Sequence, residues 1–184
     1  QMIGYTINDQ KLSEIYQAND KHWLDAENGF PAVKSNGEVF TIEDALAITG
    51  VEPFALTSLT DTDFTIGHYN EPWQFQITKF GFDGSTTALS LTDGYAGGTF
   101  DGEYGVVIQQ ALDLQRAKYF VKQNSETIYE IESFAEFSTI NPNPIITSVS
   151  DRKLPTAVFF PEGHASGSHK LPVIVSIYGG PHHS

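Results

Sequence analysis

The stretch Leu-Pro-Val-Ile-Val-Ser-Ile-Tyr-Gly-Gly-Pro-His-His-Ser, residues 171–184, decides the predicted fold. Its aliphatic run, Val173–Ile177, is interrupted only by Ser176 and stops at two glycines and a proline. A short apolar run bounded in this way predicts a strand that is buried on both faces, as in a mostly parallel sheet. The glycines allow a sharp turn, and Pro181 then fixes the direction in which the chain leaves it.

Tyr178 ends this predicted strand and is the candidate catalytic residue. A phenol O–H held at a strand end beside glycines can point at an oxyanion that develops during a reaction. The simpler interpretation, which Tyr-Gly-Gly-Pro alone favours, is a half-buried aromatic side chain without a chemical role.

Residues 171–182 resemble the first core strand and oxyanion loop of the prolyl oligopeptidase family, on its dipeptidyl-peptidase IV side. The resemblance implies an N-terminal β-propeller joined to a C-terminal α/β-hydrolase domain. It also implies that the Tyr178 hydroxyl belongs to the oxyanion hole. The residues implied to shape the active-site loop are Gly179, Gly180, Pro181 and His182.

The region from residue 1 to about 144 is predicted to be mostly β. Asn36-Gly37 between two extended runs predicts a hairpin, and Trp73–Phe80 alternates apolar and polar residues at period two. Many short strands with spaced turns fit a sandwich, a barrel or propeller blades. Ala18–Asp25 and His68–Phe75 are similar to blade elements of the resembled family, which favours a partial propeller. At about 40–50 residues per blade, the region would hold about three blades.

Helical periodicity is scarce in the same region. Asp44–Ile48 and Gln109–Arg116 could each form a short helix, but both fit a strand equally well. The thirteen Phe, eight Tyr and two Trp are spread through the predicted strands. This distribution predicts packing in the core and between blades rather than a ligand-binding platform.

Asn141-Pro142-Asn143-Pro144 is the predicted domain boundary, because alternate prolines keep the backbone extended and remove ladder donors. Residues 1–144 would be the C-terminal part of a propeller, and 145–184 the truncated start of a hydrolase domain. Ile145–Val149 and Leu154–Phe160 predict a β-hairpin that opens this second domain. Since the chain begins with Gln1 and stops soon after a predicted strand, we expect a fragment of a longer protein.

Composition narrows the classes of partner. Twenty-three acidic and ten basic residues give a net charge of −13, which argues against nucleic acid and anionic membrane surfaces. The absence of cysteine from the sequence excludes disulfides and thiolate chemistry and leaves the compartment open. The apolar runs are too short to span a bilayer, and no signal peptide is recognisable near Gln1.

A serine hydrolase of this fold needs a Gly-x-Ser-x-Gly elbow between a strand and a helix. Gly163–Gly167 (Gly-His-Ala-Ser-Gly) has the wrong spacing, so we expect the catalytic Ser, Asp and His beyond Ser184. No calcium-loop pattern occurs among the carboxylates, and we expect neither a metal nor another cofactor. The histidines near the end of the chain favour surface positions over metal ligation: His164, His169, His182 and His183.

The resemblance implies a fragment of a serine peptidase that cleaves oligopeptides through an acyl-enzyme, and we expect the fragment to be inactive alone because it lacks the triad. The implied partner is a peptide substrate, and a homo-oligomer of the full-length protein stays open. Two alternatives remain: an all-β, propeller-type binding module without catalysis, and an acylaminoacyl peptidase or esterase of the same fold.

Overall fold

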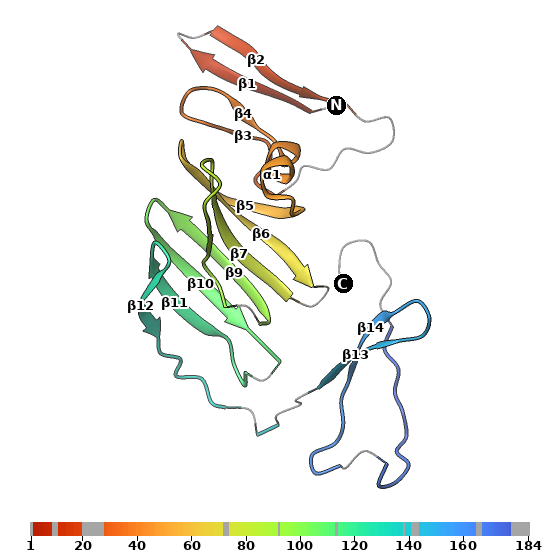
Figure 1. Cartoon of the computed structure of the whole chain (residues 1–184). Helices are drawn as coiled ribbons and strands as arrows, with labels where there is room; N and C mark the ends of the chain where they lie inside the picture. The colour runs from red at the N-terminus through yellow and green to blue at the C-terminus, as the bar shows by residue number, and fades with distance from the viewer. Residues whose placement is uncertain are drawn as a thin grey trace.

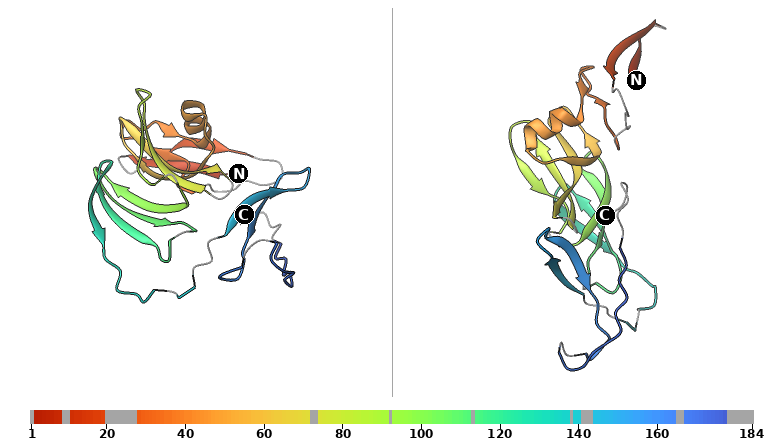
Figure 2. Two further views of the ribbon diagram at one scale, coloured as in Figure 1. Left: turned by 60° about the horizontal axis from the view of Figure 1, so that its bottom comes forward. Right: turned by 90° about the vertical axis from the view of Figure 1, so that its right-hand side faces the viewer.

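The computed structural model describes residues 2–8, 11–19, 28–71, 74–91, 93–112, 114–137, 139–140, 144–164 and 167–177. Within these ranges the chain is mostly β with a single helix, which confirms the predicted mostly-β class. Figures 1 and 2 show a β-hairpin near each end of the chain and a twisted sheet between them.

The N-terminal part contains two hairpins and the helix. Strands β1 (Met2–Asn8) and β2 (Lys11–Ala18) pair antiparallel, as do β3 (Ala32–Val33) and β4 (Val39–Phe40). The second hairpin turns at Gly37, whose φ of 84° is one that glycine adopts without strain, and this confirms the predicted turn.

Helix α1 (Ile42–Thr49) settles the ambiguous segment 44–48 as helix. The Thr41 hydroxyl accepts from the Asp44 N–H at 3.2 Å, and the Asp44 carboxylate accepts from the Thr41 N–H at 2.9 Å. This reciprocal capping box satisfies N–H groups that the first helical turn leaves unpaired. Gly50, with φ 68°, ends the helix in the left-handed conformation that favours glycine.

The main sheet consists of two antiparallel meanders of four strands each. The first meander contains β5 (Pro53–Leu59), β6 (Asp63–Glu71), β7 (Gln74–Gly81) and β8 (Thr86–Ala88). The second meander contains β9 (Tyr95–Asp101), β10 (Tyr104–Gln110), β11 (Lys118–Gln123) and β12 (Glu126–Ile131). A single parallel pair, Phe75 with Tyr95, joins them into one sheet. Gln109 and Gln110 end a strand, and the other described residues of the ambiguous segment, 111–112 and 114–116, lie in a loop.

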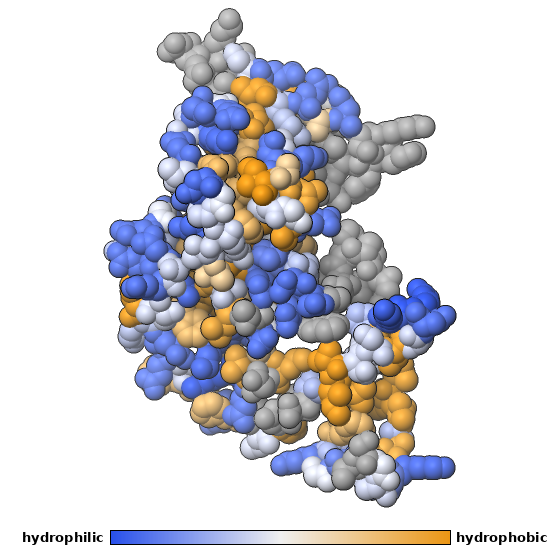
Figure 3. Space-filling view, in the orientation of Figure 1, coloured by the Kyte–Doolittle hydropathy of each residue, from blue (hydrophilic) through white to orange (hydrophobic). Residues whose placement is uncertain are grey.

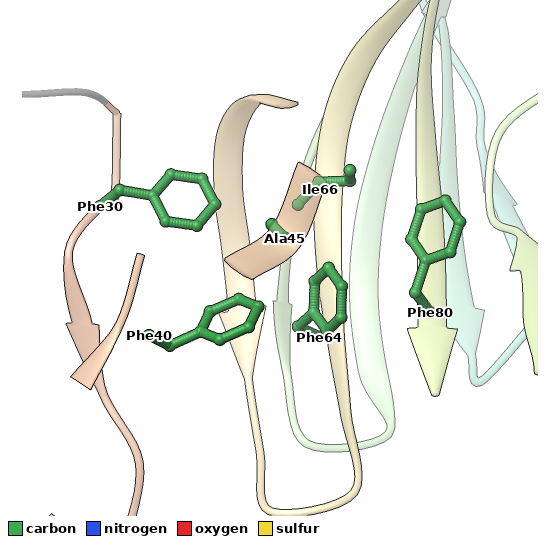
Figure 4. Packing of buried hydrophobic residues seen from close by; sticks show 6 residues of the cluster. All are labelled: Phe30, Phe40, Ala45, Phe64, Ile66 and Phe80. Atoms are coloured by element: carbon green, nitrogen blue, oxygen red, sulfur yellow. The ribbon is translucent and has the colours of Figure 1, made fainter. Parts of the chain in front are cut away.

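One face of the first meander packs against α1 and the β3–β4 hairpin (Figure 4). Phe64 lies at the centre of this cluster, fully buried, with its ring centroid 4.8 Å from that of Phe40 and 5.7 Å from that of Phe80. The buried members of the cluster are Phe30, Phe40, Ala45, Phe64, Ile66 and Phe80.

A second buried cluster lies between the two meanders: Ile77, Leu89, Ala96, Phe100 and Val107. The fully buried Gln109 side chain fixes the connection between the meanders. Its Oε1 accepts from the Leu91 N–H at 3.2 Å, and its Nε2 donates to the Asp93 carbonyl at 2.7 Å. The amide thus pairs both of its polar ends inside the protein, as a buried polar group requires.

The other face of the second meander is apolar but exposed. Cross-strand register places Ile108 opposite Tyr119, and Tyr119 opposite Ile131, all on this face. The apolar side chains that the register puts there are 37–61% exposed: Val106, Ile108, Tyr119, Tyr129 and Ile131. We call this surface the outward face.

The C-terminal part forms the predicted hairpin, β13 (Ile145–Val149) with β14 (Leu154–Val158). It lies apart from the main sheet in Figure 1, and hydrophobic side chains gather over this part of the chain in Figure 3.

The predicted core strand Val173–Ile177 does not form: residues 171–177 belong to no strand. The side chains of Val173, Ile174, Val175 and Ile177 are 73–96% exposed. A parallel strand needs neighbours that crossover connections of a dozen or more residues deliver. None of the described segments supplies such a neighbour, so the prediction of a buried strand is wrong for this chain.

Candidate functional site

The predicted oxyanion loop lies outside the described residues: Tyr178, Gly179, Gly180, Pro181 and His182. Its assignment therefore stays a prediction. The segment that leads to it is extended and exposed, so in this structure it presents no buried oxyanion pocket.

The loop after β14 brings together two of the histidines singled out in the sequence. The His164 ring stacks on Phe160 with centroids 5.1 Å apart, and the His169 ring meets it edge-on at 4.9 Å. The Ser168 hydroxyl lies 3.0 Å from His169 Nδ1. No cluster of three or more potential metal ligands occurs among the described residues. Since the described part of 163–167 is turn and coil, it offers no strand-to-helix nucleophile elbow.

An aromatic patch at one end of the main sheet is the site that the structure itself singles out. We define this patch by four residues: Phe54, Tyr69, Phe75 and Tyr95. They come from the start of β5, the end of β6, and the starts of β7 and β9. Phe54 is the extra residue where the β5–β6 register shifts between Pro53 and Ala55. Such bulges re-aim a side chain and are over-represented beside active sites.

Phe75 is the buried centre of the aromatic patch. Phe54 and Tyr69 meet its ring edge-on at 5.5 and 5.0 Å, whereas Tyr95 stacks on it at 4.8 Å with an interplanar angle of 21°. Gly67 makes room for the Phe75 ring, because a Cβ at this position would lie 2.6 Å from the Phe75 Cζ. The three outer residues stay 40–47% exposed, and exposed apolar patches of this kind mark interaction or ligand-binding sites.

A shallow groove of about 420 Å³ opens beside the aromatic patch and shares Tyr95 with it. Its wall is completed by Gly94, Gln110, Ala111, Leu112 and the segment 114–117. Burial raises the pKa of the Tyr95 phenol, and the neighbouring Tyr69 phenol adds to the rise. The Tyr95 phenol therefore keeps its hydroxyl proton near neutral pH and can donate a hydrogen bond.

Arg116 also lines this groove, but its guanidinium is engaged elsewhere. Its Nη1 donates to the Ser133 carbonyl at 2.7 Å and to the Ala135 carbonyl at 3.3 Å. Its Cζ lies 4.1 Å from the centroid of the Phe137 ring. Arg116 thus holds the segment that follows β12.

His68 is a buried histidine on the opposite face of β6 from Tyr69. Its Nε2 lies 2.9 Å from the Thr78 hydroxyl, and its Nδ1 makes no hydrogen bond of good geometry with the described residues. Burial lowers the pKa of the imidazole, and the Tyr69 backbone only partly offsets this. Without a carboxylate or a groove beside it in the described contacts, His68 has a packing role.

Comparison with known proteins gave no match: no family model, no curated protein and no solved structure is similar to this chain. None of the helical segments described has the length and apolar character needed to cross a membrane. The case for a function therefore rests on the residues and their geometry.

Sequence reasoning missed the exposed aromatic patch around Phe75. The aromatic side chains were predicted to pack in the core and between blades, and the burial of Phe75 and Phe64 agrees with this. The exposure of Phe54, Tyr69 and Tyr95 depends on a bulge and on a pairing between distant strands. A period-two alternation in the sequence predicts neither the bulge nor the pairing.

Proposed function

We propose that this chain is part of a serine peptidase of the prolyl oligopeptidase type, with the last blades of a propeller followed by the start of a hydrolase domain. The observation that carries the proposal is the order of residues 171–182, an apolar run followed by Tyr-Gly-Gly-Pro-His. Tyr178 would donate its hydroxyl to the tetrahedral oxyanion, together with a backbone N–H beside a serine outside this chain.

The repeated meanders support the propeller part of the proposal. Propeller blades are four-stranded sheets arranged around a central channel, with about 40–50 residues per blade. The meanders start at Pro53 and Tyr95, 42 residues apart. Their first strands, β5 and β9, contact each other as innermost strands of adjacent blades would. The exposed outward face of the second meander suits the packing of one more blade.

The C-terminal hairpin supports the domain order. Hairpin β13–β14 forms its own two-stranded sheet after the proline-rich boundary and precedes the segment 171–177. Exposure of four aliphatic side chains in this segment fits a strand whose partners belong to a sheet outside this chain.

The test is made on the longest natural protein that contains this sequence. We expect it to carry a Gly-x-Ser-x-Gly elbow followed by Asp and His, to react with a fluorophosphonate probe, and to hydrolyse peptide amides. Tyr178→Phe should lower kcat by roughly 10²–10³, because one oxyanion donor is lost. His183→Gln, at the position directly after the loop residues 179–182, serves as control and should lose far less activity.

Two outcomes would overturn this function. A longer protein without a serine elbow and without probe labelling would instead be an all-β binding module. Preference for acylated amino-terminal residues or for esters over free-amine peptides would favour an acylaminoacyl peptidase or esterase of the same fold.

A further inference from the structure

The ring of Tyr95 is shared between the aromatic patch and the groove. One of its faces stacks on Phe75, while 47% of the residue stays exposed and contributes to the groove wall. A ligand in the groove can therefore contact this ring. Aromatic faces carry negative electrostatic potential and attract cations that lie over them.

Three residues of the aromatic patch each have an exposed acidic residue two positions away in the sequence. Glu52 lies two residues before Phe54, Glu71 two residues after Tyr69, and Asp93 two residues before Tyr95; all three acidic residues are exposed. Gln109 Nε2 donates to the Asp93 carbonyl at 2.7 Å, which fixes the backbone of Asp93 directly before the groove residue Gly94. Acidic side chains beside exposed rings are complementary to a positively charged partner.

Few basic residues occur in the part of the sequence that builds the aromatic patch and the groove; one of them, Arg116, lines the groove with its guanidinium held by the Ser133 and Ala135 carbonyls. Lys79 is the only lysine or arginine between Lys34 and Arg116, against twelve acidic residues in that interval. Lys79 is four residues beyond Phe75 on β7, about 13 Å along the strand at the usual rise of about 3.3 Å per residue. The sequence interval that contains the aromatic patch is therefore strongly acidic.

We infer that the aromatic patch and its groove bind an arginine side chain of an extended peptide, with the guanidinium stacked on Tyr95 and paired with the carboxylate of Asp93 or Glu71. Arginine fits better than lysine because its planar, weakly hydrated guanidinium both stacks on aromatic rings and binds carboxylates with two donors. The chain already contains such a stack, that of Arg116 on Phe137.

The occupant is a peptide rather than a nucleic acid or a lipid surface, because both of those are anionic and would be repelled. A groove of about 420 Å³ holds more than one side chain, so neighbouring peptide residues can contribute. Binding of this kind does not depend on the catalytic proposal, and it stands whether or not the longer protein hydrolyses peptides.

The first experiment uses the full chain and three fluorescein-labelled peptides: Gly-Arg-Ala-Arg-Ala, its lysine counterpart and its glutamine counterpart. Fluorescence anisotropy should show the arginine peptide binding at least about tenfold tighter than the glutamine peptide, with lysine in between. Binding should weaken as salt rises, since exposed charges are screened. Equal binding of the arginine and glutamine peptides would overturn the inference, and this comparison needs no variant.

The second experiment locates the binding site. Tyr95→Leu should weaken binding of the arginine peptide about five- to tenfold, and Glu71→Gln or Asp93→Asn about two- to fivefold. Tyr129→Leu is the matched control, because Tyr129 is an exposed tyrosine on β12 outside the patch. Equal affinity of the Tyr95 and Tyr129 variants would overturn the location. If acetyl-arginine amide displaced the labelled peptide with the same affinity as the peptide itself, the requirement for a peptide would be overturned.

Discussion

The two meanders have the same strand connectivity but bury their side chains differently. The first meander packs one face on α1 and the β3–β4 hairpin and turns Ile77 of the other toward the second meander. The second meander buries only the face that meets the first, and its outward face keeps apolar side chains in solvent. This difference indicates that the outward face is an interaction surface, since contiguous exposed apolar surface marks such sites.

The largest expected effect is in the first meander. Phe64→Ala should reduce the free energy of unfolding by about 3–5 kcal/mol, because it removes a fully buried ring that packs on Phe40, Phe80 and Phe82. Urea denaturation, monitored by circular dichroism, measures this loss.

Tyr129→Ala on the outward face is the matched control and should change the free energy of unfolding by less than about 0.5 kcal/mol. A loss above about 2 kcal/mol for Tyr129→Ala would mean that this face is covered in solution. The contrast between the meanders would then be wrong.

Neighbouring glycines of β9 provide a sharper test of the two faces. A Cβ on Gly98 would lie 2.8 Å from both Ile77 Cδ1 and the Val106 carbonyl oxygen, whereas a Cβ on Gly97 would meet nothing within 4 Å. Gly98→Val should therefore destabilise by about 1–3 kcal/mol through overpacking between the meanders. Thermal unfolding measures the change in stability for Gly98→Val and for its control, Gly97→Val.

Gly97→Val, on the outward face opposite Ile108, should be neutral or slightly stabilising. If both variants lose the same stability, the meanders do not pack through this face of β9.

Removing the buried Gln109 amide between the meanders should cost as much stability as Gly98→Val or less. Gln109→Leu leaves the Leu91 N–H and the Asp93 carbonyl without their partner, which costs about 1–3 kcal/mol. Gln110→Leu, at the exposed next position, should cost less than about 0.5 kcal/mol. Hydrogen exchange of the Leu91 amide checks the mechanism: it should speed up in the Gln109 variant and stay unchanged in the Gln110 variant.

Local signals in the sequence predicted the local structure of this fold. Asn36-Gly37 predicted the β3–β4 turn, the alternation of residues 73–80 predicted β7, and the runs 145–149 and 154–160 predicted the β13–β14 hairpin. Helix α1 was left ambiguous although its signals are present: Thr41 with Asp44 three residues later, and Gly50 after the last turn. A helix of eight residues has too few turns for periodicity to decide, so the caps carry the information.

Long-range pairing could not be predicted in the same way. The Phe75–Tyr95 pair joins the meanders and builds the aromatic patch, and no local pattern encodes which strands meet. In the sequence, Gln109 is an ordinary polar residue at a strand end, and nothing marks it as a buried amide that makes two hydrogen bonds. Val173–Ile177 shows the opposite case: its composition favours a buried strand, but its aliphatic side chains are exposed and it pairs with none of the described strands.

The smallest expected effect concerns pH and His68 in the first meander. Burial lowers the folded-state pKa of His68, so the unfolded chain, with an ordinary histidine pKa of about 6.5, takes up the proton first as pH falls. His68 therefore contributes stability that is present above about pH 7 and is lost as pH drops through about 6.5, levelling off below the folded-state pKa. Urea denaturation of wild type and His68→Gln at about pH 7.5 and about pH 5.5 measures the contribution, with exposed His169→Gln as control.

The advantage of wild type over His68→Gln should shrink at the lower pH, whereas the His169 variant should show no such change. An advantage that stays constant or grows on acidification would mean that the imidazole is not held in its neutral form inside the first meander.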